Sequence, residues 1–462
     1  MLAQIFCESS YVTLDFKASE EARKTSMLLA FRAENARSFR GSVELSLEAT
    51  RLAEAEVVRE IPWREGGQPI EVLPVAGLFG ANASGKTNLL RIMSDLRGFV
   101  VHSFRRGNPG GGLPARPFLL GDDGAGSPTT YEVDVVLGGV LHKYRLKING
   151  KRVLEESAHS FPRGRSLLLF ERTGDAVRLG ATQRGRGRAV VEILRPNALF
   201  LSTAAATNHP LLIGLFEWFQ RNLLFADVQS RSVRQALTAG MLEQEDLREG
   251  VLELLREADL GITGAKKREL DPEIKERVVR ALNVLRGEEE GDEAVEEIEF
   301  DDFEVRLLHR SSGGEVELNP VDESRGTLIW FGMVGPVIEA LQKGSLLLAD
   351  ELDASLHPAL VSALISLFQS KRSNPRRAQL IFNAHDVTVM GDSATHPLGR
   401  DQIWFTEKDE DGGTRLYPLS DLNPRKGEAV GRRYLAGRYG ATPIVSTRAI
   451  QQIAESVAVG VE

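Results

Sequence analysis

Residues 80–87, which read GANASGKT, constrain the fold of this chain more than any other stretch. They match the phosphate-binding P-loop pattern at every fixed position. An apolar run at residues 75–79 precedes the loop, and residues 86–99 carry apolar positions at helical spacing. A glycine loop between a strand and a helix directs backbone N–H groups toward phosphate oxygens. The sequence therefore predicts an α/β fold built around a nucleotide phosphate site, rather than a chance glycine turn.

The motif gives individual residues their expected roles. Gly80 and Gly85 let the backbone curl, Lys86 reaches the β- and γ-phosphates, and the Thr87 hydroxyl ligates Mg²⁺. We therefore expect ATP and Mg²⁺ as cofactors, with Lys86 contributing to catalysis. The remaining residues expected to contact the nucleotide here are Asn82, Ala83, Ser84 and Asn88.

A second apolar run, residues 345–349, ends in two adjacent carboxylates, Asp350 and Glu351. Because neighbouring residues of a strand point to opposite faces, the two acids can have different roles. Asp350 is expected to hold the Mg²⁺ shell and Glu351 to act as the general base on the attacking water. Taken alone, a strand that simply ends in charged turn residues explains this segment equally well.

The continuation of the chain favours the catalytic interpretation. Residues 352–358 read LDASLHP, and after a helix-length gap another apolar strand, residues 378–384, ends at His385 and Asp386. A histidine at the end of the neighbouring strand is well placed to touch the γ-phosphate or its water.

Together these motifs resemble the ATP-binding heads of ABC-type ATPases, of the kind found in SMC and RecF-like proteins. The resemblance identifies Asp353 with the D-loop and His385 with the H-switch. It also implies a signature loop that caps the nucleotide of a partner subunit. Ser324 and Gly326, in the segment ESRGT, are the candidates, although the segment departs from the LSGGQ form. An ordinary serine N-cap is the alternative, and no convincing Q-loop glutamine is found.

Further phrases narrow the resemblance. Residues 34–39, ENARSF, resemble the NFRSF start of such heads, which implies that Arg37 and Ser38 lie beside the nucleotide. The phrases DQIWFTEK, LYPLSD and YLAGRYG, within residues 401–440, resemble the C-terminal part of RloA-like ATPases, a group that includes the ATPase subunit of the PARIS anti-phage system. This resemblance implies an ATP-dependent sensor or scaffold beside a separately encoded, nuclease-like effector.

The expected fold class is an α/β ABC-ATPase head with a β-rich lobe and a helical insertion. The β-rich lobe is indicated by alternating residues 131–138 and 140–148 around a Gly-Gly turn. The expected segments are an N-terminal extension (1–26), the P-loop part of the head (27–207), a mostly helical insertion (208–318) and the C-terminal part of the head (319–462).

Charge and composition bear on partners and location. A formal net charge of −8 argues against a protein that coats nucleic acid by bulk electrostatics, so nucleic acid is neither implied nor excluded. The sequence has no apolar run long enough to span a bilayer, and it contains a single cysteine, Cys7. These two features predict a cytoplasmic protein without internal disulfides. The resemblance implies a head-to-tail homodimer closed around ATP, or a higher homo-oligomer. A RecF-type DNA repair or maintenance ATPase, acting directly on DNA, is the alternative function.

Overall fold

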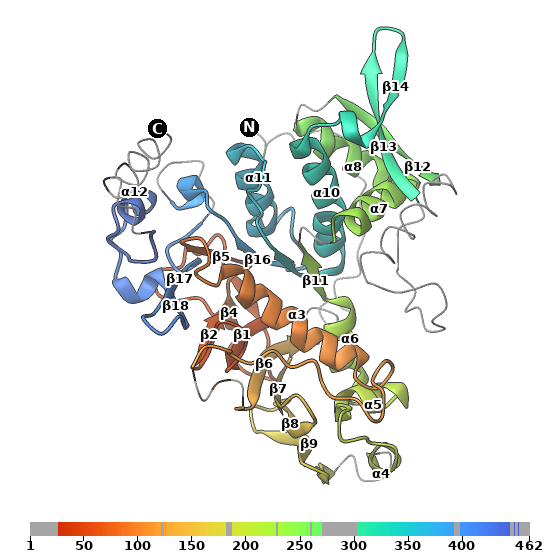
Figure 1. Cartoon of the computed structure of the whole chain (residues 1–462), viewed down its shortest axis with the longest axis vertical. Coiled ribbons are helices and arrows are strands. Elements are labelled where there is room, and N and C mark those ends of the chain that lie inside the picture. Colours follow the sequence, from red (N-terminus) through yellow and green to blue (C-terminus); the bar gives the residue numbers. More distant parts are fainter. Residues whose placement is uncertain are drawn as a thin grey trace, which may run out of the picture.

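The computed structural model (Figure 1) describes residues 26–121, 124, 126–181, 187–227, 230–258, 261–269, 303–391, 398–443, 448 and 451. The predicted N-terminal extension therefore lies outside the described residues, apart from Ser26, which is the first residue of strand β1. No helix in the described ranges is long and apolar enough to cross a membrane.

The P-loop strand lies in a six-stranded sheet, the core sheet, in the order β11-β15-β16-β5-β17-β18. All of its strands are parallel except β18, which pairs with β17 in an antiparallel hairpin. Parallel strands bring their carboxyl ends to one edge of a sheet, which is where ligand sites form in α/β proteins. The strands are β5 (Val75–Gly80), β11 (Leu223–Ala226), β15 (Leu346–Ala349), β16 (Gln379–Asn383), β17 (Ile403–Lys408) and β18 (Thr414–Pro418).

A second sheet of seven antiparallel strands forms the β-rich lobe, in the order β10-β9-β8-β7-β6-β1-β2. The predicted hairpin is confirmed, with Gly138 and Gly139 both at positive φ between β6 and β7. The strands are β1 (Ser26–Glu34), β2 (Val43–Ser46), β6 (Thr129–Leu137), β7 (Val140–Ile148), β8 (Val153–Ser160), β9 (Leu167–Thr173) and β10 (Ala176–Leu179).

Helix α3 (Lys86–His102) lies between these two sheets. The core sheet is apolar on both faces, as expected for parallel strands covered on each side. One face, including Leu78 and Leu348, packs with α3 and the inner face of the seven-stranded sheet. The other face, including Phe79 and Leu347, packs against α10 (Arg325–Lys343) and α11 (Pro358–Gln369). This layering confirms the predicted α/β class.

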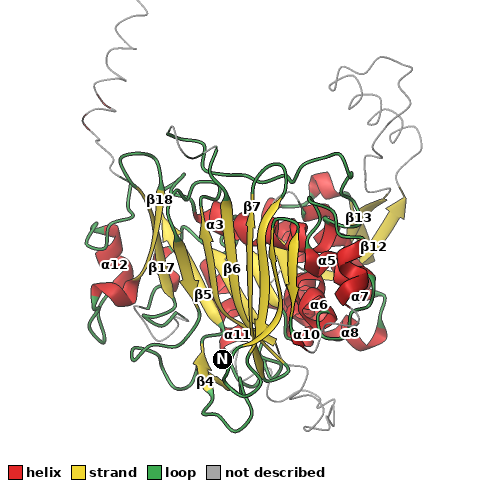
Figure 2. Cartoon of the chain, turned by 90° about the horizontal axis from the view of Figure 1, so that it is seen from below, coloured by secondary structure: helices red, strands yellow, loops and turns green. Residues whose placement is uncertain are grey.

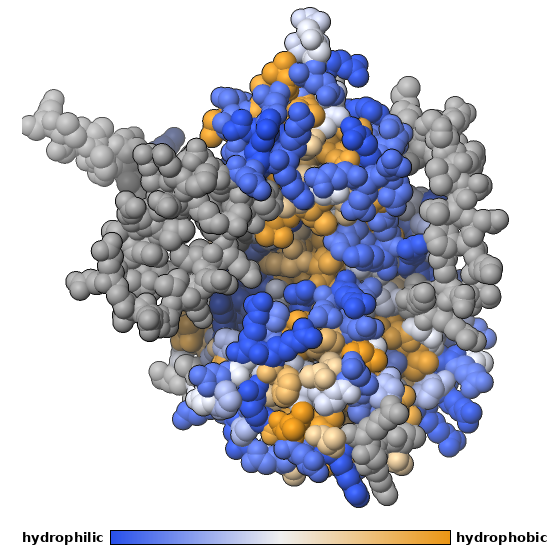
Figure 3. All heavy atoms as spheres, turned by 90° about the vertical axis from the view of Figure 1, so that its right-hand side faces the viewer, coloured by the Kyte–Doolittle hydropathy of each residue, from blue (hydrophilic) through white to orange (hydrophobic). Residues whose placement is uncertain are grey.

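The remaining elements flank these layers. Figure 2 shows β17, β5, β6 and β7 through the middle of the molecule, with α5–α8 and α10 on one flank and α12 on the other. Seen from the side that carries β12–β14, apolar side chains gather across the middle of the face, between two largely hydrophilic parts (Figure 3). These elements are α4 (Gly187–Glu192), α5 (Phe200–Ala206), α6 (Ile213–Arg221), α7 (Arg231–Leu242), α8 (Glu245–Glu257), α12 (Val430–Leu435), β3 (Arg59–Ile61), β4 (Ile70–Val72), β12 (Ile262–Glu269), β13 (Phe303–Ser311), β14 (Gly314–Leu318), η2 (Pro320–Asp322), η3 (Val387–Val389) and η4 (Leu419–Leu422).

The segment 208–318, expected to be mostly helical, contains both helices and strands among its described residues. Within it, β11 joins the core sheet as the parallel neighbour of β15, whereas β12 and β13 pair with β14 in a separate sheet. The apolar residues of β11 directly follow the amphipathic α6, so the helical pattern conceals a short strand at this point. The proposed segment boundaries themselves stay a prediction.

Candidate nucleotide-binding site

The predicted phosphate loop leaves β5 at the carboxyl edge of the core sheet and enters α3. A Cβ at Gly85, whose φ is 110°, would lie 2.4 Å from the Thr414 hydroxyl oxygen, so a side chain has no room there. Gly85 is the N-cap of α3 and provides no side-chain cap. The first N–H groups of the helix therefore keep their capacity to bind an anion.

Within the loop, Asn82 and Ala83 are exposed, and Ala83 has a left-handed backbone with φ 61°. Ser84 is buried instead, and its hydroxyl contacts that of Thr406 at 2.6 Å. The Ser84 carbonyl accepts a bond from the Thr414 hydroxyl at 2.9 Å. The hairpin β17–β18 thus fixes the shape of the loop through the contacts of Thr406 and Thr414 with Ser84.

Lys86 folds back over the loop. Its ammonium donates to the carbonyl oxygens of Gly80 at 2.8 Å and Ala81 at 3.0 Å. Burial lowers the pKa of Lys86, an effect opposed by the neighbouring carboxylates, that of Asp353 foremost. The Lys86 ammonium is thus held against the backbone of the glycine loop.

The Thr87 hydroxyl and the Asp350 carboxylate, which sequence analysis assigned to Mg²⁺, lie together. Thr87 Oγ1 donates to Asp350 Oδ1 at 2.8 Å. Asp350 is buried, with 8% of its surface exposed. No cluster of three or more His, Cys, Asp or Glu that could hold a metal occurs among the described residues. The pair fits Mg²⁺, which proteins bind through one or two side chains together with substrate phosphates.

Glu351 lies beside Asp350 but differs in environment. It is exposed, and its backbone is left-handed, with φ 54°. Sequence analysis expected the two acids to separate because strand residues alternate. In the structure β15 ends at Ala349, so the tight turn after the strand separates them instead. A non-glycine residue with this backbone stores strain, a feature that clusters at functional sites.

The strand that precedes the two acids, β15, and the strand that precedes His385, β16, were predicted to be neighbours. This prediction is confirmed, because β15 and β16 pair in parallel. His385 is exposed just beyond β16. Its backbone N–H and that of Asp386 both donate to Asp353 Oδ2, at 2.7 and 2.8 Å. Asp353 therefore fixes the turn that carries His385.

Asn383 was missed by sequence analysis, although it lies at the centre of the site. Its amide donates to Asp350 and Thr87, and its carbonyl oxygen accepts the Glu351 N–H. A polar residue that ends a buried strand, two positions before His385, was the available signal, since ligand sites lie at such strand ends.

Arg37 and Ser38, which the resemblance places beside the nucleotide, each have a partner of their own. Arg37 makes a two-pronged ion pair with Asp95 of α3, at 2.6 and 2.8 Å. The Ser38 hydroxyl lies 2.9 Å from the Thr414 hydroxyl. Together with Asn88 they line a hollow of about 430 Å³, which residues 115–120 close from the other side. The hollow therefore adjoins the first turn of α3 through Asn88.

Ser324 and Gly326 lie at the start of α10, away from the P-loop contacts described above. Ser324 is the N-cap of α10, and its hydroxyl accepts the Thr327 N–H at 3.0 Å. A Cβ at Gly326 would lie 2.7 Å from the carbonyl oxygen of Ser355 in the predicted D-loop. The N-cap geometry agrees with both interpretations of this segment, the signature and the plain cap.

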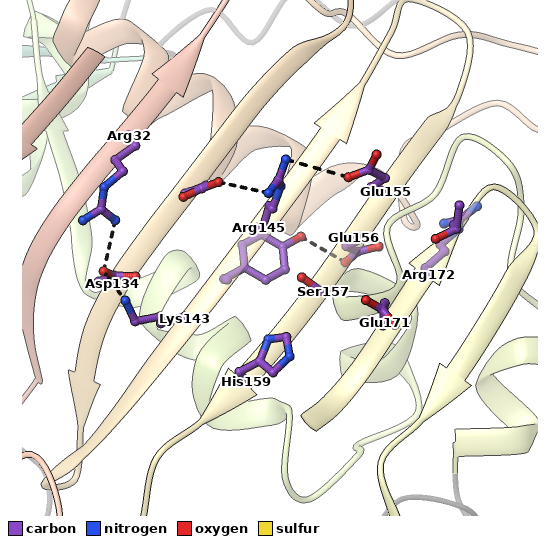
Figure 4. A pocket seen from close by; sticks show the side chains of 13 residues that line it. Arg32, Asp134, Lys143, Arg145, Glu155, Glu156, Ser157, His159, Glu171 and Arg172 are labelled. Atoms are coloured by element: carbon purple, nitrogen blue, oxygen red, sulfur yellow. Dashed lines mark hydrogen bonds and ion pairs between the residues drawn. The ribbon is translucent and has the colours of Figure 1, made fainter. Parts of the chain in front are cut away.

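A second hollow, of about 380 Å³, lies on the outer face of the seven-stranded sheet (Figure 4). Its basic side chains already have partners. Arg32 and Lys143 each contact Asp134 at 3.0 Å, and Arg172 donates to backbone carbonyls such as that of Ala198. Arg145 lies 3.8 Å from Glu155. Mixed and mutually paired charges do not make a phosphate cradle, so this hollow is a poorer candidate than the glycine loop.

A protein-family model described as "AAA domain, putative AbiEii toxin, Type IV TA system" matches residues 75–182 and 220–391. These stretches contain the glycine loop, Asp350, Glu351 and His385, and together they cover more than half of the sequence. The chain belongs to this AAA family. The predicted P-loop ATPase class is thereby confirmed for this AAA domain.

Several solved structures are also similar to the chain. An SMC head bound to the C-terminal winged-helix domain of ScpA matches with 12% identity and TM-score 0.38, over 86% of this chain and 99% of that one. The SMC head domain from Thermotoga maritima matches with 14% identity and TM-score 0.35, over 85% and 98%. An Smc head with an extended coiled coil, bound to the C-terminal domain of ScpA derived from Pyrococcus furiosus, matches with 13% identity and TM-score 0.37. The match covers 86% of this chain and 98% of that one. The search of curated proteins found no match.

Proposed function

We propose that this AAA-family protein binds ATP with Mg²⁺ at the glycine loop and hydrolyses it with Glu351 as the general base. The observation that carries the proposal is the direct contact between Thr87 and Asp350, which the fold brings together from residues 263 apart. This pair meets Glu351 and the uncapped start of α3 at one edge of the core sheet. A metal-binding pair, a carboxylate base and a helix N-terminus at one point fit phosphoryl transfer to water.

Different residues of the site bind the phosphates, hold the metal and activate the attacking water. The N–H groups at the start of α3 and the Lys86 ammonium bind the phosphates, and Thr87 with Asp350 would hold Mg²⁺, which offsets phosphate charge when bound. Glu351, exposed beside them, orients the attacking water and accepts its proton. His385, held by the turn that Asp353 fixes, contacts the γ-phosphate or that water.

Two heads are proposed to pair head to tail, so that Ser324 and Gly326 of one subunit cap the ATP of the other. Support comes from the close approach of Gly326 to the Ser355 carbonyl, which makes the signature and D-loop segments one continuous surface. Ser324 also leads into α10, so the positive end of that helix accompanies it toward a partner's γ-phosphate. ATP would then stabilise the pair, and hydrolysis would release it.

At the cellular level, we propose a nucleotide-dependent sensor or scaffold of an anti-phage defence complex, working with a separately encoded, nuclease-like effector. Support comes from the RloA-like phrases near the C-terminus. They meet in one aromatic cluster, with the Phe405 ring 5.3 Å from that of Tyr434 and 5.9 Å from that of Tyr439. The description of the matching family also names a toxin of a type IV toxin–antitoxin system.

The test begins with ATP hydrolysis by the purified wild type, Lys86→Ala and Glu351→Gln. Lys86→Ala should lose ATP binding, and Glu351→Gln should bind ATP but turn it over about 10²–10⁴-fold more slowly, with a paired state accumulating. Wild-type turnover in either variant contradicts the proposed site. Co-purification with the product of a neighbouring gene, with and without ATP, tests the effector. A salt-titrated DNA-binding assay tests the RecF-like alternative, because direct phosphate contacts impose a steep salt dependence.

A further inference from the structure

Asn383 is the last residue of β16 and is 1% exposed. It lies where β16 ends between the acid-bearing strand β15 and the P-loop strand β5. A buried amide must satisfy both its donor and its acceptor, because an unpaired buried polar group is costly. The partners of this side chain therefore show what it is built to hold.

Those partners are the metal-binding pair and the base. The Asn383 Nδ2 donates to Asp350 Oδ1 at 2.6 Å and lies 3.3 Å from Thr87 Oγ1. The Asn383 Oδ1 accepts the backbone N–H of Glu351. One side chain thus contacts groups that come from α3 and from the turn after β15.

The amide is suited to this position because it donates through one atom and accepts through the other. Its donor half fixes the orientation of the Asp350 carboxylate, whose Oδ1 also receives the Thr87 hydroxyl. Its acceptor half holds the N–H of Glu351, the residue with the left-handed backbone. An aspartate here would keep only the acceptor, and a leucine would keep neither.

From these contacts we infer that Asn383 is a positioning residue that couples the Mg²⁺-binding pair, Thr87 and Asp350, to the backbone geometry of the general base Glu351. This inference rests on the proposed ATPase function and adds a group that acts through Thr87, Asp350 and Glu351. Loss of such supporting partners typically costs about 10–100-fold in metal affinity or activity.

The chain offers a matched control in Asn374, which is also 1% exposed and lies shortly before the same strand. Its side chain bonds only to backbone groups, those of Phe368 and Ala378. Asn374→Leu therefore removes a buried amide of equal burial without touching the site. Asn383→Leu removes both halves of the coupling, and Asn383→Asp replaces the donor with a carboxylate oxygen that repels Asp350.

Two measurements are made on the full chain: the affinity for a fluorescent ATP analogue with and without Mg²⁺, and kcat and KM for MgATP. In Asn383→Leu the gain in nucleotide affinity that Mg²⁺ confers should shrink by about 10–100-fold, with a similar fall in kcat and unchanged metal-free affinity. Asn374→Leu should lower the denaturant midpoint and leave the Mg²⁺ gain and kcat unchanged.

If Asn383→Leu does not fold, Asn383→Asp carries the test, because it retains the acceptor for Glu351 and should still lose the wild-type Mg²⁺ gain. Wild-type Mg²⁺ gain and kcat in a folded Asn383 variant overturn the inference, as does an equal loss in Asn374→Leu. A wild type that binds nucleotide with Mg²⁺ but does not hydrolyse it refutes the proposed reaction, while the Mg²⁺ gain still decides the role of Asn383.

Discussion

The left-handed backbone of Glu351 predicts that a residue needed for hydrolysis lowers the stability of the fold. Its φ of 54° is a conformation that side chains with a Cβ adopt at a cost of about 1–2 kcal/mol, whereas glycine adopts it freely. Glycine also makes the unfolded chain more flexible, which offsets about 0.4–1 kcal/mol of the gain. Glu351→Gly should therefore be more stable than Glu351→Ala by roughly 0.5–1 kcal/mol.

The comparison is made between the two variants because both lack the carboxylate and differ only in the Cβ. Unfolding by urea without nucleotide gives the stability difference, and both should lose about 10²–10⁴-fold in ATP turnover. Ala354, in the same turn, is not among the described residues with positive φ, so Ala354→Gly should destabilise and serves as the control of opposite sign. Greater stability of Glu351→Ala than of Glu351→Gly would refute the left-handed assignment.

Three further predictions concern the signature, the β-rich lobe and the N-terminal segment. Ser324→Asp keeps an N-cap acceptor for α10 but directs a negative charge toward a partner's phosphate, so it should preserve thermal stability and abolish ATP-driven pairing. Mixing this variant with Lys86→Ala should restore partial turnover. Unchanged turnover of Ser324→Asp alone would favour the plain N-cap. Glu156 is buried and accepts the N–H groups of Phe200 and Leu201, so Glu156→Gln should lower the unfolding free energy by about 1–3 kcal/mol, measured in urea. Removing residues 1–25 should leave ATP turnover and the melting temperature unchanged, because β1 begins at Ser26; an insoluble product would contradict this.

The parts of the site that could be predicted from sequence are those whose residues are contiguous. The glycine loop and the acidic pair each carry their chemistry within one short segment, and the strand before each is marked by its apolar run. The contacts of Thr406 and Thr414 with the loop could not be predicted, because they depend on which strands become neighbours. The same holds for Asn383, whose partners come from two distant segments.

Other sequence expectations needed tertiary information of a different kind. The ENARSF motif drew attention to Arg37, but the pairing of Arg37 with Asp95 depends on how α3 packs beside the turn after β1. Strand β11 could not be predicted, because its four apolar residues closely follow the amphipathic helix α6 and continue the helical pattern. Such a short run acquires its strand identity only by pairing with β15.

The order of strands in the core sheet has a consequence for biosynthesis. The P-loop strand β5 lies in the sheet between β16 and β17, both of which the ribosome makes much later than β5. The contact between Ser84 and Thr406 likewise joins residues that are 322 positions apart. Pairings between such distant segments form slowly and leave apolar edges uncovered meanwhile. A nascent chain that has emerged only as far as β15 has its glycine loop but neither strand that flanks β5. Nucleotide capture should therefore begin only once synthesis has passed β17, long after the glycine loop itself has been made.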